Sequence, residues 1–216
     1  MSITTILFDA DGVIQTTPET FIPQLKSLIN EKDKADQFLN DIFTVEYPFL
    51  KSGNNFDKDL SIVLKKWNVK TPLNQVLKIW ELVNPVTEII AEIRNLQEYG
   101  IKCYLATNQQ YHRAKYMRSV LNYDKLFDGS YYSYQMDSVK PEELFFQKIL
   151  SGLSIHPSKI LFIDDKLNNI IAARKCGIQA FQFNVNFMEN PGEKLHEELS
   201  KFDISYNNLK TSVQKC

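Results

Sequence analysis

The sequence predicts an α/β fold: a Rossmann-like parallel sheet covered by helices on both faces, with a small four-helix cap inserted after the first strand. Three observations support this prediction. An apolar, β-branched segment lies near the N-terminus, only helical periodicity follows in residues 17–82, and strand-like and helix-like segments alternate from residue 84 onward. Such alternation is typical of βαβ units, which build parallel sheets whose strands are buried on both faces.

The N-terminal part of the chain is expected to form one strand and then four helices. Residues 3–8 are apolar and rich in β-branched side chains, which predicts a strand. In residues 17–82, apolar side chains recur at helical spacing in four stretches, which predicts four amphipathic helices. We expect Thr71 to cap the fourth helix and Pro72 to occupy its first position. The breaks between the stretches are expected at Pro48, at Gly53 and at the Thr71-Pro72 pair.

Strands and helices are expected to alternate in the rest of the chain. Apolar segments predict strands at residues 101–107, within 126–134, at 159–165 and at 178–183. Periodic segments predict helices from Asn84-Pro85 to Gly100, over residues 109–121, from Pro141 to Leu150, and up to Cys176 with a stop at Gly177. After Asn190 we expect a weak helix and then a polar end that frays.

These elements divide the chain into two domains. The first strand and the alternating segments are expected to form a core domain, residues 1–16 and 83–216, and the four helices a cap domain, residues 17–82. A chain of 216 residues is long enough for one well-packed domain with a smaller insert.

Composition and charge limit the classes of partner. The net charge is −1, so the chain lacks the basic surface of a nucleic-acid binder, and no apolar run reaches the roughly 20 residues of a membrane span. No signal peptide is visible, and the three cysteines, Cys103, Cys176 and Cys216, are widely spaced and odd in number. We therefore expect a cytoplasmic protein with no nucleic-acid and no membrane partner. The oligomeric state is open, with a monomer slightly favoured.

Polar residues follow three of the expected strands, at the point where each strand ends. They are Asp9 and Asp11, Thr107 and Asn108, and Asp164 and Asp165. Ligands of a parallel sheet bind outside the carboxyl ends of its strands. Four carboxylates gathered there repel one another unless a cation lies among them, and oxygen donors without imidazole or thiolate favour Mg²⁺. The sequence therefore predicts a site for magnesium and phosphate.

Four short motifs resemble those of the haloacid dehalogenase superfamily. DADGV, ATN, VKP and FIDD occur in the order of that family's motifs, and the pattern extends through Phe183. The insert directly after DADGV resembles the helical C1 cap of the branch that contains haloacid dehalogenases and sugar phosphatases. The resemblance implies a Mg²⁺-dependent enzyme that works through an aspartyl-phosphate.

By this resemblance, the first motif carries the reacting carboxylates. Asp9 would be a metal ligand and the nucleophile that attacks phosphorus. Asp11 would be the general acid–base that protonates the leaving oxygen and later activates water, and its backbone carbonyl would ligate Mg²⁺. Gly12 would allow the tight turn after the strand and backbone amides that face phosphate.

The other motifs are implied to bind phosphate and metal. Thr107 would hydrogen-bond a phosphoryl oxygen, and Asn108 would position the same group or the adjoining loop. Lys140 would neutralise charge on the phosphoryl oxygens and on the nucleophile in the transition state. Asp164 and Asp165 would hold the metal. The resemblance favours Asp165 as the direct ligand and Asp164 as acting through metal-bound water, a distinction that the sequence does not decide.

The expected reaction is hydrolysis of a small phosphorylated metabolite, with sugar phosphates first. Haloacid dehalogenases lack an acid at the position of Asp11, so this residue favours phosphoryl chemistry over carbon–halogen cleavage. Hydrolysis is the simpler outcome, because water needs no binding site of its own. A phosphomutase of the β-phosphoglucomutase type and a non-catalytic phosphate-binding module stay open as alternatives.

Overall fold

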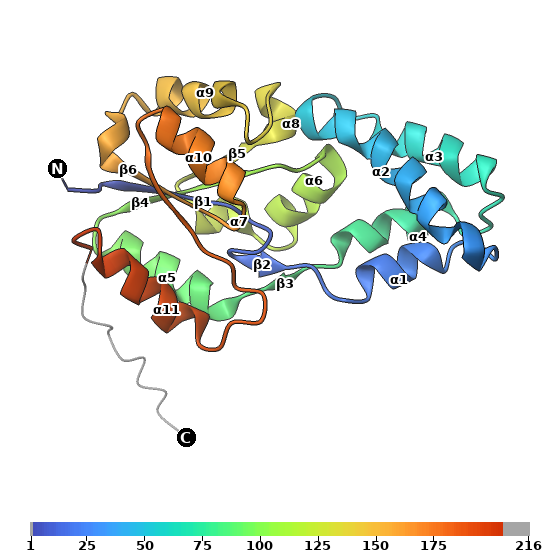
Figure 1. Ribbon diagram of the computed structural model, residues 1–216, viewed down its shortest axis with the longest axis horizontal. Helices are drawn as coiled ribbons and strands as arrows, with labels where there is room; N and C mark the ends of the chain where they lie inside the picture. Colours follow the sequence, from blue (N-terminus) through green and yellow to red (C-terminus); the bar gives the residue numbers. More distant parts are fainter. Residues whose placement is uncertain (1, 205–216) are drawn as a thin grey trace.

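The computed structural model describes residues 2–204 and contains a five-stranded parallel sheet (Figure 1). The strand order is β5-β4-β1-β6-β7, and each pairing is parallel. The strands are β1 (Thr5–Phe8), β4 (Lys102–Thr107), β5 (Gly129–Tyr132), β6 (Ile160–Asp164) and β7 (Gln179–Gln182). The predicted α/β fold with a Rossmann-like parallel sheet is confirmed.

The order of the strands reverses at β1, which pairs with β4 on one side and with β6 on the other. Every residue of β1 and β6 is buried, as expected for central strands that are covered on both faces. In sheets of this kind, ligands bind outside the carboxyl ends of the strands, next to the reversal. The ends of β1, β4 and β6 are therefore the place where a site is expected.

Helices cover both faces of the sheet (Figure 1). Side chains alternate along a strand, so Ile6 and Phe8 pack into one apolar cluster and Leu7 packs into the other. Helices α5, α6, α7 and α11 contribute to the first cluster, and α9 and α10 contribute to the second. Their bounds are α5 (Thr87–Glu98), α6 (Tyr111–Ser119), α7 (Tyr123–Leu126), α9 (Glu143–Leu153), α10 (Leu167–Lys175) and α11 (Pro191–Ser200).

Residues 17–82 form a helical group with its own apolar core, which we call the helical insert. Trp80 and Phe56 are buried at its centre and pack edge to face, with ring centroids 5.1 Å apart. The helices of the insert are α1 (Phe21–Lys26), α2 (Ala35–Lys51), α3 (Phe56–Lys66) and α4 (Leu73–Leu77), with 3₁₀ turns η1 (Lys32–Lys34) and η2 (Lys78–Glu81).

Two short antiparallel strands join the helical insert to the sheet. Strand β2 (Gln15–Thr16) pairs with β3 (Asn84–Pro85), so the chain enters and leaves the insert side by side. A further contact involves α8 (Ser133–Met136), where the hydroxyl of Ser133 donates to the backbone carbonyl of Leu50 in α2. The insert lies beyond the carboxyl end of the sheet (Figure 1).

The predicted break at Pro48 is wrong, because α2 continues through this residue to Lys51. A proline removes its own N–H from the helix, and here that loss falls in the last turn. Phe49 packs against Phe56 of the next helix, with ring centroids 6.2 Å apart, and this contact supports the turn. Tertiary packing therefore outweighs the local effect of the proline.

Four helices start later than predicted. At Asn84-Pro85 the chain pairs with β2 instead of beginning a helix, a pairing that the local sequence does not reveal. The starts are Leu73 and not Pro72 for α4, Thr87 and not Asn84 for α5, Tyr111 and not Gln109 for α6, and Glu143 and not Pro141 for α9.

The C-terminal part of the described chain ends in helix α11. This helix is the one predicted after Asn190, and it packs on α5 through Leu195 and Leu199. Residues 205–216, which include the polar end expected to fray, lie outside the described residues. Among residues 2–204, no helix has the length and apolar character that crossing a bilayer requires.

Candidate active site

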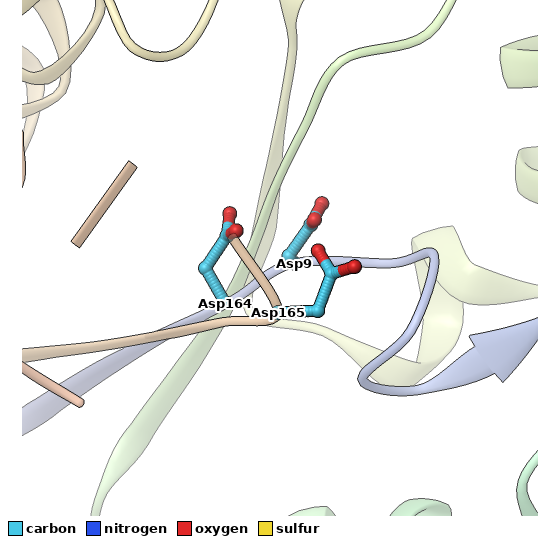
Figure 2. A group of neighbouring side chains, drawn as sticks. All are labelled: Asp9, Asp164 and Asp165. Atoms are coloured by element: carbon cyan, nitrogen blue, oxygen red, sulfur yellow. The ribbon is translucent and has the colours of Figure 1, made fainter. Parts of the chain in front are cut away.

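Three carboxylates meet where the central strands end. Asp9 follows β1, Asp164 is the last residue of β6, and Asp165 follows it directly. One oxygen from each of the three lies within 4.8 Å of the others, and the side chains point toward the same space (Figure 2). The structure therefore brings together three of the four carboxylates that the sequence singles out.

The ammonium group of Lys140 lies inside this acidic cluster. Its Nζ is 2.8 Å from Oδ1 of Asp9 and 2.7 Å from Oδ2 of Asp164, and it donates to the carbonyl of Ala106 at 2.8 Å. The side chain is 1% exposed. Burial opposes the charged form, but the charges of Asp9 and Asp164 outweigh it and raise the pKa of Lys140 above its ordinary value. Lys140 is therefore a buried cation that neutralises two carboxylates.

Asp9 is buried and is held by two hydrogen-bond donors. Its Oδ1 accepts hydrogen bonds from Lys140 and from the backbone N–H of Ala10, the latter at 2.7 Å. Burial raises the pKa of Asp9 to about 7, and the charge of Lys140 opposes this effect while that of Asp164 adds to it. A carboxylate held in this way is a candidate nucleophile, because few of its interactions must be rearranged before it reacts.

The two neighbouring aspartates, Asp164 and Asp165, differ in their hydrogen-bond partners. Asp164 is fully buried and accepts from Lys140, from the backbone N–H of Lys166 at 2.8 Å, and from Nδ2 of Asn169 at 2.9 and 3.0 Å. By contrast, the buried Oδ1 of Asp165 has no hydrogen-bond partner among residues 2–204. Burial and the charge of Asp164 raise the pKa of Asp165. An unpaired carboxylate oxygen beside Asp9 fits a hard cation such as Mg²⁺.

Gly12 makes room for Asp165. Its φ is +82°, and a Cβ atom at this position would lie 2.8 Å from Cγ of Asp165. The N–H of Gly12 donates to the carbonyl of Gln15 at 2.8 Å, so it closes the turn after β1. The contribution of Gly12 to the site is therefore the close approach of two loops, and its own amide is already engaged.

Asp11 lies outside the cluster of three carboxylates and has its own set of donors. NH2 of Arg113 is 2.7 Å from its Oδ1, Nε2 of Gln15 is 2.9 Å from the same oxygen, and Nε2 of Gln109 is 2.7 Å from Oδ2. These three residues were not predicted from the sequence, although Gln109 directly follows the ATN motif and Arg113 lies five positions after it. The polar run TNQQYHR at the end of a buried strand was the available signal.

Thr107 is the last residue of strand β4, and Asn108 directly follows it. Thr107 is 1% exposed, and its hydroxyl accepts from Gln109 at 3.4 Å. Nδ2 of Asn108 donates to the carbonyl of Lys140, and Oδ1 of Asn108 accepts from the N–H of Lys140, both at 2.9 Å. Asn108 therefore holds the adjoining loop, one of the two roles predicted for it.

A cavity of about 410 Å³ opens beside the cluster. Asn108, Lys140 and Asp165 contribute to its wall, together with the start of α10 and Gln182. It gives solvent and small molecules a way toward the carboxylates.

A family model described as haloacid dehalogenase-like hydrolase matches residues 6–183. A curated protein, the sesquiterpene phosphatase astK of Aspergillus oryzae (strain ATCC 42149 / RIB 40), is 32% identical over 89 residues. These residues are 40% of this chain and 44% of that protein, so the match spans less than half of the relative's length.

Solved structures of low sequence identity share the fold. A HAD-like family hydrolase from Porphyromonas gingivalis superposes with a TM-score of 0.75 at 21% identity, covering 95% of this chain and 100% of that chain. A HAD family enzyme from Bacteroides thetaiotaomicron, solved in complex with magnesium and inorganic phosphate, has a TM-score of 0.70 at 22% identity. In that case 84% of this chain and 94% of the other are covered.

Proposed function

The chain belongs to the haloacid dehalogenase-like hydrolase family, and on this basis we propose that it is a Mg²⁺-dependent phosphatase that hydrolyses a small phosphorylated metabolite. The reaction would proceed through an aspartyl-phosphate on Asp9. The observation that carries the proposal is the meeting of a buried carboxylate, a buried ammonium and an unpaired carboxylate oxygen at the carboxyl end of the sheet. Asp9, Lys140 and Asp165 supply these three groups.

In the first step, a carboxylate oxygen of Asp9 attacks phosphorus as the bond to the ester oxygen breaks. Lys140 lies 2.8 Å from Asp9 and neutralises the charge that develops on the phosphoryl oxygens. The hydroxyl of Thr107, which ends the neighbouring strand, is assigned to a phosphoryl oxygen. The ester oxygen takes a proton from the protonated carboxyl group of Asp11, so the organic leaving group departs as an alcohol.

In the second step, water attacks the phosphorus of the aspartyl-phosphate, and the bond to Asp9 breaks. Asp11 takes the proton of the attacking water, which restores both carboxyl groups to their starting forms. Water is available through the cavity beside Lys140 and Asp165. This sequence of steps releases inorganic phosphate.

Asp9, Asp165 and the backbone carbonyl of Asp11 are the groups that we assign to Mg²⁺. The ion would supply positive charge to the phosphoryl oxygens and would lower the repulsion between the carboxylates. Asp164 already accepts from three donors, so we assign it to holding Lys140.

The helical insert is proposed to act as a cap domain that selects the substrate. Strand β2 begins just beyond the turn of Asp11 and Gly12, and β3 pairs with it, so both ends of the insert lie next to this turn. Sugar phosphates are the substrates that we place first. The sesquiterpene phosphatase among the relatives makes terpenyl phosphates the second class to test.

Hydrolysis of p-nitrophenyl phosphate tests the proposal. We expect turnover that needs Mg²⁺, that stops with EDTA, and that is lost in Asp9→Asn. Equal rates in the wild type and Asp9→Asn would leave only a phosphate-binding module. With a sugar phosphate as substrate, formation of an isomeric sugar phosphate and not of free phosphate would instead identify a phosphomutase. A panel of sugar and terpenyl phosphates would then define the substrate class.

A further inference from the structure

Arg113 is a buried cation next to the proposed general acid–base. Its side chain is 9% exposed and extends from the first turn of α6. One guanidinium nitrogen, NH2, lies 2.7 Å from Oδ1 of Asp11 and 3.4 Å from the hydroxyl of Thr17. Burying a charge is costly unless it is paired, and Asp11 is the carboxylate that pairs with the buried guanidinium of Arg113.

Thr17 and Glu46 connect Arg113 to the helical insert. Thr17 directly follows β2, where the chain enters the insert, and Glu46 lies on α2 and accepts from Nε1 of Trp80 at 2.7 Å. Burial raises the pKa of Glu46 to about 7, and the hydrogen bond from Trp80 and the charge of Arg113 oppose this rise. Arg113 therefore interacts with Asp11 on one side and with the insert on the other.

The ion pair accounts for the separate position of Asp11. Asp9, Asp164 and Asp165 share one space, whereas the carboxylate of Asp11 is directed to Arg113, Gln15 and Gln109. A divalent cation among the three clustered carboxylates would also attract a fourth carboxylate. Arg113 is the cationic partner that opposes this attraction, because Gln15 and Gln109 are neutral.

We propose that Arg113 is a positioning residue that holds the carboxyl group of Asp11 away from the metal. Arg113 binds Oδ1 of this group, and the other oxygen, Oδ2, carries the proton that passes to the leaving oxygen. The inference rests on the proposed phosphatase function. Arg113 acts through Asp11, and the hydroxyl of Thr17 accepts a hydrogen bond of 3.4 Å from the same guanidinium nitrogen. Bond changes are those of the hydrolysis described above, with the proton passing from Asp11 to the ester oxygen.

The kcat/KM values for two aromatic phosphate esters distinguish a positioning role of Arg113 from a purely structural role. Phenyl phosphate has a poorer leaving group than p-nitrophenyl phosphate, so it depends more on protonation by Asp11. In Arg113→Met, we expect kcat/KM to fall about 100-fold for phenyl phosphate and about 10-fold or less for p-nitrophenyl phosphate. Arg113→Lys, which keeps a charged donor, should recover part of the loss. Equal losses for both esters would overturn the inference.

A double-mutant cycle tests whether Arg113 acts through Asp11. In an Asp11→Asn background, Arg113→Met should change kcat/KM for phenyl phosphate less than about 3-fold, because the group that it positions is already lost. Mg²⁺ affinity, measured by calorimetry, should be equal or tighter in Arg113→Met, because Asp11 is free to approach the ion. Additive losses in the cycle or weaker Mg²⁺ binding would contradict the positioning role.

Arg118→Met is the matched control. Arg118 lies on the same helix and pairs with Asp124 at 2.9 Å, with its side chain 37% exposed. If Arg113→Met behaves like Arg118→Met while the wild type is active, the inference fails and the phosphatase proposal stands. If the wild type itself fails to hydrolyse both esters with Mg²⁺, the phosphatase proposal fails first. If Arg113→Met does not fold, Arg113→Lys carries the same comparison of the two esters.

Discussion

The side-chain amide of Asn108 exchanges two hydrogen bonds with the backbone of Lys140, each of 2.9 Å. Asn108 is the first residue after β4, and Lys140 belongs to a loop 32 residues later in the chain. The pair fixes the backbone from which the lysine side chain reaches Asp9 and Asp164. Asn108 therefore controls the position of the buried ammonium without touching it.

Replacing Asn108 by alanine should loosen this loop. Loss of two hydrogen bonds is expected to lower the free energy of unfolding by about 1–3 kcal/mol in urea titrations. The kcat for p-nitrophenyl phosphate should fall by roughly 10-fold or more, because small errors in position are costly for catalysis. Asn74→Ala, at an exposed position of α4, is the control and should leave both quantities unchanged. Unchanged kcat in Asn108→Ala would show that Lys140 is placed by other contacts.

Gly12 and Gly100 allow a matched test of the turn after β1. Both have positive φ, +82° and +93°, so alanine should cost each about 1–2 kcal/mol of backbone strain. A Cβ atom at Gly12 meets Asp165 at 2.8 Å, whereas one at Gly100 meets no atom of residues 2–204 within 4 Å. Gly12→Ala should therefore also abolish turnover and Mg²⁺ binding by calorimetry. If the two variants were equally active, the close approach to Asp165 would have no role in function.

Replacing Asp165 or Asp164 by asparagine should have different effects on stability and on its increase with Mg²⁺. Asp165→Asn removes a carboxylate that is repelled by its neighbours, so the melting temperature in EDTA should not fall. The increase that Mg²⁺ produces in the wild type should disappear. Asp164→Asn breaks a buried ion pair with Lys140, and it should lower the free energy of unfolding by about 3 kcal/mol even in EDTA. A Mg²⁺-induced stabilisation that survives in Asp165→Asn would exclude this residue as a ligand.

Glu46 should make stability depend on pH. Its pKa is about 7 in the folded protein and has the lower ordinary value of a glutamate in the unfolded chain. The folded state therefore binds the extra proton, and stability from this group decreases as the pH rises toward 7. Glu46→Gln cannot titrate, so its melting temperature relative to the wild type should increase between pH 5 and pH 8.

The groups that face Glu46 are the same in the wild type and in Glu46→Gln. Arg113 and Asp11 act on its charge, and Trp80 donates to its carboxyl group. Glu31→Gln, at an exposed position, serves as the control and should show no such trend. A pH-independent difference between Glu46→Gln and the wild type would mean that Glu46 titrates normally in the folded protein.

Predictions from the sequence were correct where they depended on residues close together in the chain. The alternation of buried strands and amphipathic helices predicted the sheet, and pairs of polar residues at strand ends predicted where Asp9, Asp164 and Asp165 meet. Helix starts were less well predicted, because the pairing of Asn84-Pro85 with β2 depends on residues far away in the chain.

The surroundings of Asp11 could not be predicted in the same way. Gln15, Gln109 and Arg113 were visible as polar residues, but only the folded chain shows that they share one carboxylate. The same holds for the division of roles between Asp164 and Asp165, which follows from the donors that happen to reach each of them. The cytoplasmic location and the monomeric state stay predictions from the sequence.

The pairing of β2 with β3 has a consequence for the evolution of the protein. Since the two crossing points are neighbours, removing or exchanging everything between them would leave the ends of the sheet where they are. A different group of helices could be grafted at this junction without moving Asp9 or Lys140. Under the proposed function, recombination at these two points would change substrate preference and leave the nucleophile and the buried ammonium in place.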